Sequence, residues 1–199
     1  MKIIGKIGFN RAVQSRDTSS TSYLFKNYDY SQAGAYFITI CTKQKQCIIF
    51  GEIKNGKMRF NALGSIADKY WQEIPQHFPN VALDVYTIMP NHLHGILWII
   101  ESSQRDNKNR KFGDIVIGSI SSIVRSYKAI VTKKINKICN AKGLSVVWQS
   151  RYYEQIIRNE KALVNIRSYI INNPLNWDID EENPKIDEYQ PDILLDLPF

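Results

Sequence analysis

Several short stretches of the chain alternate between apolar and polar positions, which is the pattern of strands that place one face in a core. The segment 34–46, GAYFITICTKQKQ, alternates in this way and is rich in aromatic and β-branched residues. Residues 47–61 predict a hairpin that turns at Asn55-Gly56, a pair favoured in two-residue turns. Further strands or extended segments are expected at 82–88, 94–100, 144–149 and 152–158.

Three other stretches repeat their apolar residues at the spacing of an amphipathic helix. They cover residues 64–78, 117–139 and 160–172. Asn159 is placed to cap the last helix, and Pro174 should end it. The resulting order is β, hairpin, α, β, β, α, β, β, α, without the regular βαβ alternation of a parallel sheet. We therefore predict an α+β fold in which an antiparallel sheet has helices packed on one face.

The length of 199 residues and the 44% share of hydrophobic residues indicate one globular domain with extensions. No apolar run is long enough to cross a membrane, and the N-terminal residues do not form a convincing signal peptide. Cys41, Cys47 and Cys139 are odd in number and form no CxxC pair, which is typical of a reducing compartment. We therefore expect a cytoplasmic protein with no membrane association.

The net charge of +7 is unevenly distributed along the chain. Residues 105–142 carry ten Lys and Arg against two acids, whereas residues 178–199 carry eight acids and one Lys. A concentrated basic segment favours a nucleic-acid partner, although a solvated helix face gives the same pattern. The acidic tail is either a solvated extension or a DNA mimic that lies on the basic surface. The candidate nucleic-acid contacts are the basic residues outside the apolar stripe of the second helix, namely Arg125, Lys128, Lys133 and Lys137.

Two of the three histidines stand one residue apart at the start of an apolar run, in MPNHLHGILW (89–98). On a strand, His92 and His94 point to the same side, because side chains alternate with a period of two. Two neighbouring imidazoles can hold a metal ion through one ring nitrogen each. Pro90 and Asn91 predict a turn just before them. The alternative is a polar stripe on the solvated face of an antiparallel strand.

Tyr169 and Asn173 stand four residues apart near the end of the last predicted helix, and so share one helical face. A tyrosine phenolate beside a metal site can attack a phosphodiester and form a covalent intermediate. A packing role is the alternative, because most tyrosines are amphipathic packing residues. Asn173 precedes Pro174, which disfavours the helical conformation that would align its side chain with Tyr169.

Taken together, these motifs resemble those of the HUH (His–hydrophobic–His) single-tyrosine transposases of insertion sequences, and most closely the REP-associated tyrosine transposases. The resemblance covers about residues 30–177 and implies a ferredoxin-like, HUH endonuclease architecture. It divides the chain into a basic N-terminal extension (1–33), a transposase domain (34–177) and an acidic tail (178–199). The segments that carry it are MPNHLHGI (89–96), WQSRYYEQIIRNE (148–160) and YIINNPLNW (169–177).

The resemblance implies a metal-dependent endonuclease that cleaves and rejoins single-stranded DNA next to hairpins. By matched position, His92, His94 and Asn173 would bind Mg²⁺ or Mn²⁺, and Tyr169 would be the nucleophile of a 5′-phosphotyrosine intermediate. The implied partner is single-stranded or hairpin DNA, gripped by the basic segment 105–142. A homodimer and a monomer are equally compatible with the family pattern.

Two other functions fit part of the pattern. A non-catalytic or domesticated nucleic-acid-binding protein could retain the fold, and it would not need the His pair or Tyr169. A zinc hydrolase could use His92 and His94, but the sequence has no HExxH motif and His77 falls in another element. The presence of all four expected site residues favours the transposase.

Overall fold

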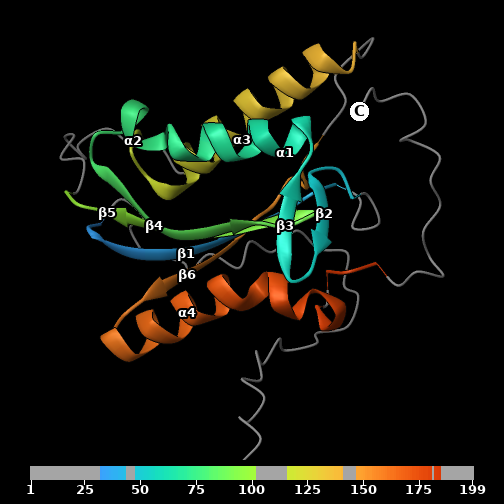
Figure 1. Cartoon of the computed structure of the whole chain (residues 1–199). Coiled ribbons are helices and arrows are strands. Elements are labelled where there is room, and N and C mark those ends of the chain that lie inside the picture. The colour runs from blue at the N-terminus through green and yellow to red at the C-terminus, as the bar shows by residue number, and fades with distance from the viewer. Residues whose placement is uncertain (1–31, 44–47, 102–115, 141–146, 181, 185–199) are drawn as a thin grey trace, which may run out of the picture.

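The computed structural model describes residues 32–43, 48–101, 116–140, 147–180 and 182–184. Its centre is a four-stranded antiparallel sheet with the strand order β4-β5-β1-β6 (Figure 1). The predicted fold class is therefore confirmed. The strands of this sheet are β1 (Gly34–Cys41), β4 (Val81–Ile88), β5 (His92–Ile99) and β6 (Tyr153–Ile157). Within the described ranges, no helix is both long and apolar enough to span a membrane.

A separate hairpin consists of β2 (Gly51–Lys54) and β3 (Lys57–Phe60). Its turn lies where the sequence predicts it, because Asn55 and Gly56 both have positive φ angles, of 54° and 67°. The segment at 144–149 forms no strand in its described part, where Trp148 makes only a single bridge to Thr42. Residues 1–31, 44–47, 102–115, 141–146, 181 and 185–199 lie outside the described residues. They include the predicted loop 102–114, most of the predicted N-terminal extension and acidic tail, and part of the basic segment 105–142.

The helices cover both faces of the sheet, so the prediction of helices on one face was wrong. Figure 1 shows α1 (Ala62–Gln72) and α3 (Ile120–Ile138) on one side and α4 (Glu160–Asn172) on the other. The cause is the composition of the strands. In β1, Tyr36 and Ile38 point into a core with α1 and α3, whereas Phe37 points into a core with α4.

The single helix predicted at 64–78 is two helices, because α1 ends at Gln72 and α2 (Ile74–His77) follows it. Pro75 explains the break, since it has no N–H and its ring clashes with the carbonyl four residues earlier in a continuous helix.

At the other end of the chain, α4 stops before Pro174 as predicted. The chain then continues as a 3-10 helix, η2 (Asn173–Ile179), whose first turn accommodates the proline.

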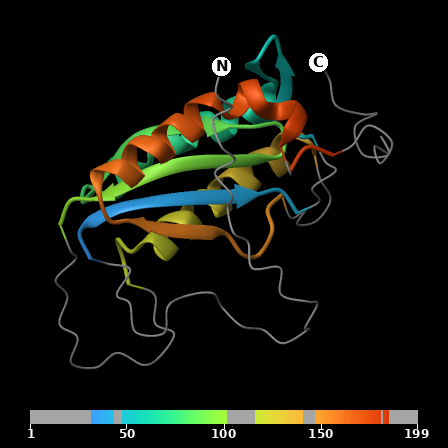
Figure 2. The same cartoon turned by 90° about the horizontal axis from the view of Figure 1, so that it is seen from below.

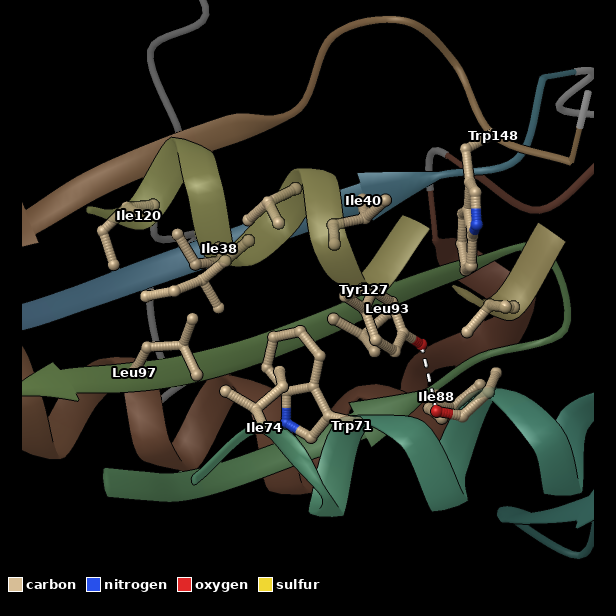
Figure 3. Packing of buried hydrophobic residues seen from close by; sticks show 14 of the residues in the cluster. Ile38, Ile40, Trp71, Ile74, Ile88, Leu93, Leu97, Ile120, Tyr127 and Trp148 are labelled. Atoms are coloured by element: carbon tan, nitrogen blue, oxygen red, sulfur yellow. Dashed lines mark hydrogen bonds between the residues drawn. The ribbon is translucent and has the colours of Figure 1, made fainter. Parts of the chain in front are cut away.

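The larger core lies between the sheet and the pair α1 and α3 (Figure 3). Trp71, Leu93 and Tyr127 are buried at its centre, and the Tyr127 hydroxyl donates to the carbonyl of Ala67 at 3.1 Å. Gly95 lies beneath the indole, where an added Cβ would come within 2.5 Å of Trp71 Cζ2. This core fixes which side of β5 faces α1, and therefore which side is left for α4.

The smaller core holds α4 on the opposite face, which Figure 2 shows from below. Leu163, Ile166 and Ile170 recur at helical spacing and pack against the sheet. The helix begins as predicted, because the Asn159 side chain accepts a hydrogen bond from the Ala162 N–H at 2.9 Å. Burial of this apolar stripe determines how the last helical turn is presented to β5.

A polar contact orients α4 further. The pairing of β4 with β5 shifts register between Leu83 and Tyr86, which both pack into the larger core. The irregularity turns Asp84 and Val85 toward α4 together, which a regular strand would not allow. The Asp84 carboxylate accepts three hydrogen bonds from Arg167 of α4, two from Nε and one from Nη2, and the shortest N–O distance is 2.6 Å.

The charge on Asp84 should stabilise the fold in a pH-dependent way. Burial raises the pKa of Asp84, but hydrogen bonds from Arg167, Trp98 and the Val85 N–H outweigh it and hold the pKa below its usual 3.8. Stabilisation from a depressed pKa is present above the unfolded value and disappears as the pH falls through the folded value. Asp84→Asn should therefore lower the free energy of unfolding by about 1–2 kcal/mol at pH 7.

Urea unfolding of wild type and Asp84→Asn between pH 7 and pH 3 measures this difference. We expect the gap to narrow below about pH 4. Glu52→Gln, on the exposed face of β2, is the matched control and should be neutral. A gap that is the same at pH 3 as at pH 7 would contradict a role for the Asp84 charge.

Candidate functional site

The two histidines of the HLH sequence begin β5 and point toward α4. In the register of the sheet, His92 lies opposite Cys41 and His94 lies opposite Thr39. Both imidazoles are buried, with exposed fractions of 0% for His92 and 5% for His94. Their ring centroids are 4.6 Å apart. The prediction that both point to one side is confirmed, and the alternative of a solvated polar stripe is wrong.

The turn before β5 determines which ring nitrogen of His92 carries the proton. The Asn91 Nδ2 group donates to the carbonyl of Glu182, so the amide oxygen Oδ1 is the atom that faces His92. This oxygen lies 2.9 Å from His92 Nδ1 and can only accept, so Nδ1 carries the proton. The lone pair of the ring is then on Nε2, the arrangement in which a histidine binds a metal with its other nitrogen held by a neighbouring group.

His94 connects the sheet with α4. Its Nδ1 lies 2.8 Å from the Thr39 hydroxyl, and its Nε2 lies 3.2 Å from the hydroxyl of Tyr169. Burial, followed by the nearby His92, holds the pKa of His94 well below its usual 6.5. The imidazole is therefore neutral near pH 7, which is the form in which histidine binds a metal ion.

Asn173 lies one turn after Tyr169 and points into the same site. It keeps helical angles, φ −58° and ψ −42°, although a proline follows it. The side chain is 2% exposed, and its Nδ2 donates to Asp180 Oδ2 at 3.1 Å. Its Oδ1 is buried and has no hydrogen-bond partner within the described residues. An unsatisfied buried acceptor is costly, which suits an oxygen that serves as a metal ligand.

Asp180 completes the site and was not among the predicted residues. Its carboxylate, His92 and His94 each offer one ligand atom, and these atoms lie within 4.8 Å of one another. The family resemblance ends at Trp177, so Asp180 was assigned to the acidic tail (178–199). The 3-10 helix η2 and the hydrogen bond from the Glu182 N–H to Asp180 Oδ1 at 2.7 Å return it to the site. The signal available in the sequence was an acid shortly after the predicted ligand Asn173.

The residues present fit a divalent metal ion. Two imidazoles, an amide oxygen and a carboxylate are a mixed nitrogen and oxygen ligand set, which Mn²⁺ accepts readily and Mg²⁺ accepts with water in the remaining positions. Zinc also takes two histidines with a carboxylate. A metal ion would also give a partner to the buried Oδ1 of Asn173, which has none among the described residues.

The predicted basic contacts lie on α3, across the sheet from Tyr169. Arg125, Lys133 and Lys137 are exposed there. Lys128 is partly buried, and its ammonium donates to the carbonyls of Gln149 and Arg151, both at 2.9 Å. Burial lowers the pKa of Lys128 to about 8. The structure therefore joins His92, His94, Asn173 and Tyr169 in one site and places the four basic residues away from it.

Comparison with known proteins gives one close relative. The chain is 42% identical over 173 residues to an uncharacterised protein of Haemophilus influenzae, a match that covers 80% of this chain and 91% of the relative. No model of a protein family matches the chain.

Solved structures share the fold. The structure of a REP-associated tyrosine transposase bound to a REP hairpin superposes with a TM-score of 0.55 at 20% identity, covering 78% of this chain and 74% of that one. A transposase-like protein of Deinococcus radiodurans R1 gives a TM-score of 0.42 at 14% identity over 74% of this chain and 95% of its own, too low to support an argument. The first of these agrees with the resemblance predicted from the sequence.

Metal binding should stabilise the folded chain through the histidine pair. We expect Mn²⁺ to raise the melting temperature of the wild type, because a ligand at about 100 times its Kd adds about 2.7 kcal/mol to the free energy of unfolding. His92→Ala should remove this rise. Asp180→Asn should weaken Mn²⁺ binding by about 10- to 100-fold, as measured by calorimetric titration.

His77→Ala is the matched control, because His77 is exposed and belongs to α2. It should keep the full Mn²⁺ response. If the response survives in His92→Ala, the metal binds somewhere other than this site.

Proposed function

Because the chain belongs to one family with the Haemophilus influenzae protein and has the fold of the HUH transposases, we propose that it is a single-tyrosine HUH transposase. It would cleave single-stranded DNA next to a hairpin and rejoin it to another end. The observation that supports this most strongly is the position of the Tyr169 hydroxyl, 3.2 Å from His94 Nε2 at the candidate metal site.

Tyr169 is the proposed nucleophile. The phenolic oxygen attacks phosphorus, the bond from phosphorus to the 3′ oxygen breaks, and a 5′-phosphotyrosine remains on the protein. The phenol loses a proton, and the departing 3′ oxygen takes one up. One phosphodiester bond is exchanged for another, so transfer of the 5′-phosphoryl end from Tyr169 to a 3′-hydroxyl needs no nucleoside triphosphate.

The surrounding residues hold the phosphate and the tyrosine in place. His92, His94, Asn173 and Asp180 would hold Mg²⁺ or Mn²⁺, which when bound supplies Lewis-acid stabilisation of the charge on the phosphate. Thr39 contacts His94 Nδ1 and orients the imidazole. Phe37 packs edge-on against Tyr169 with ring centroids 6.1 Å apart and limits the rotation of the phenol.

The proposed substrate is a DNA hairpin with a single-stranded flank. The neighbour of known structure is bound to a REP hairpin, and the present chain has a basic helix that could contact a phosphate backbone. Arg125, Lys133 and Lys137 are the candidates on α3. Since they lie across the sheet from Tyr169, they would hold a part of the DNA away from the cleaved bond.

A zinc-dependent hydrolase is the second candidate function. The proximity of Asp180 to His92 and His94 supports it, since these three residues form a ligand set that zinc also uses. Hydrolysis would release both DNA ends free, whereas the transposase reaction leaves one end on the protein. The fate of the 5′ end therefore separates the two functions.

Tyr169→Phe should abolish cleavage and covalent attachment, because it removes the oxygen that attacks phosphorus. Binding of the hairpin should change by less than about tenfold, since a single hydrogen bond from the lost hydroxyl contributes only about 1 kcal/mol net. The assay incubates the protein with Mn²⁺ and labelled hairpins from the flanks of its own gene, and detects the adduct on a denaturing gel. Tyr153→Phe is the control and should form the adduct. An adduct formed by Tyr169→Phe would rule out this nucleophile.

The exposed basic residues of α3 should determine the salt dependence of DNA binding. Replacing Lys133 and Lys137 with Ala should flatten the slope of log affinity against log salt by about one to two units if both touch phosphates. Lys128→Met is the matched control on the same helix. It should leave the slope unchanged, because its ammonium is bound to backbone carbonyls. A wild-type slope in the double variant would mean that α3 is only a solvated face.

A further inference from the structure

An exposed aromatic residue lies on the same face of the sheet as the candidate nucleophile. Tyr153 begins β6, the edge strand of the four-stranded sheet (Figure 2), and 49% of its surface is exposed. Thr39 pairs with His94 on one side and with Tyr153 on the other. The three residues therefore form a row across β5, β1 and β6. Since adjacent strands are about 4.8 Å apart, Tyr153 lies roughly 10 Å across the sheet from His94.

One buried ring joins Tyr153 to the site. Phe37, which is 2% exposed, stacks on His94 with ring centroids 5.6 Å apart. The same ring makes edge contacts with Tyr169 and with Tyr153, each with centroids 6.1 Å apart. The phenol of Tyr153 is further oriented by its hydroxyl, which donates to Gln155 Oε1 at 3.3 Å. Tyr153, at the edge of the sheet, and Tyr169 therefore pack against the same buried ring.

The neighbouring aromatic residues of the same segment do not offer such a surface. Trp148 is 3% exposed and packs in the larger core against Phe50 and Tyr127. Tyr152 is directed to the other side, where its hydroxyl contacts Glu154 and the Lys128 ammonium lies over its ring. Tyr153 is therefore the residue of this segment that combines exposure with a place beside Tyr169.

We propose that the exposed face of Tyr153 stacks on a base of the single strand next to the phosphate that Tyr169 attacks. This inference rests on the proposed function, and it assigns the edge of β6 to the single-stranded flank of the hairpin. Tyr153 and Tyr169 both contact the Phe37 ring, so a nucleotide next to the attacked phosphate lies within reach of Tyr153. Stacking on an aromatic ring accepts any base, because every base has a π-face. Tyr153 is a positioning residue that holds the strand in register for attack.

The test measures binding and stacking in a protein that cannot cleave. In the Tyr169→Phe background, hairpins carry the fluorescent base 2-aminopurine at each position of the single-stranded flank in turn. We expect one position to be quenched on binding, and Tyr153→Ala to remove that quenching and weaken affinity by about 5- to 100-fold. Tyr153→Phe should restore both, since it keeps the ring and loses only the hydroxyl.

Two further variants keep the result interpretable. Tyr70→Ala removes a half-buried tyrosine from α1, on the other face of the sheet, and should change neither quenching nor affinity. Tyr153→Leu keeps a large apolar residue for the edge strand and should lose the quenching while remaining folded. Quenching and affinity that persist in both Tyr153→Ala and Tyr153→Leu would overturn the inference. Because no step requires cleavage, a failure of the covalent chemistry would not be mistaken for a failure of stacking.

Discussion

The packing of α4 on the sheet is the contact on which the candidate site depends. Two of the four site residues predicted from the sequence, His92 and His94, belong to β5, whereas Tyr169 and Asn173 belong to α4 and its end. The apolar stripe of the helix sets its distance from the sheet, and the Asp84–Arg167 pair sets its position along β4. Arg167 stands two residues before Tyr169, so the ion pair and the nucleophile share one helical turn. A shift of α4 would separate the hydroxyl from His94.

The second constraint is the burial of His92 and His94 on the α4 side of β5, which the larger core on the other side enforces. Because side chains alternate along β5, a slip of one residue would turn Leu93 toward α4 and the imidazoles into the apolar core. The cost of such a slip holds β5 in register and keeps both histidines facing α4. Burial also keeps His94 neutral, which suits a metal ligand. The unsatisfied oxygen of Asn173 and the carboxylate of Asp180 are directed at the same region. The buried oxygen of Asn173 is costly without a partner, and a cation held with Asp180 would supply one.

Local patterns predicted much of this site. The period of two in β5 was sufficient to place His92 and His94 on one side, and the spacing of Tyr169 and Asn173 was sufficient to place them on one helical face. Other features depend on tertiary packing. The register shift that turns Asp84 toward α4 has no pattern in the sequence. Asp180 reaches the site through a 3-10 helix after a proline, where helical periodicity gives no guide. Lys128 resembles a solvated lysine until its carbonyl partners are known.

The identity of the residue that becomes attached to DNA tests the account most directly. Trypsin would release residues 168–185 as one peptide, in which Tyr169 is the single tyrosine, and residues 152–158 as another, which holds Tyr152 and Tyr153. After reaction with a hairpin substrate and nuclease digestion, mass spectrometry locates the remaining nucleotide. We predict that it is carried by Tyr169 in the peptide 168–185. A nucleotide on the peptide 152–158, or none on any peptide while the DNA is cleaved, would contradict the account.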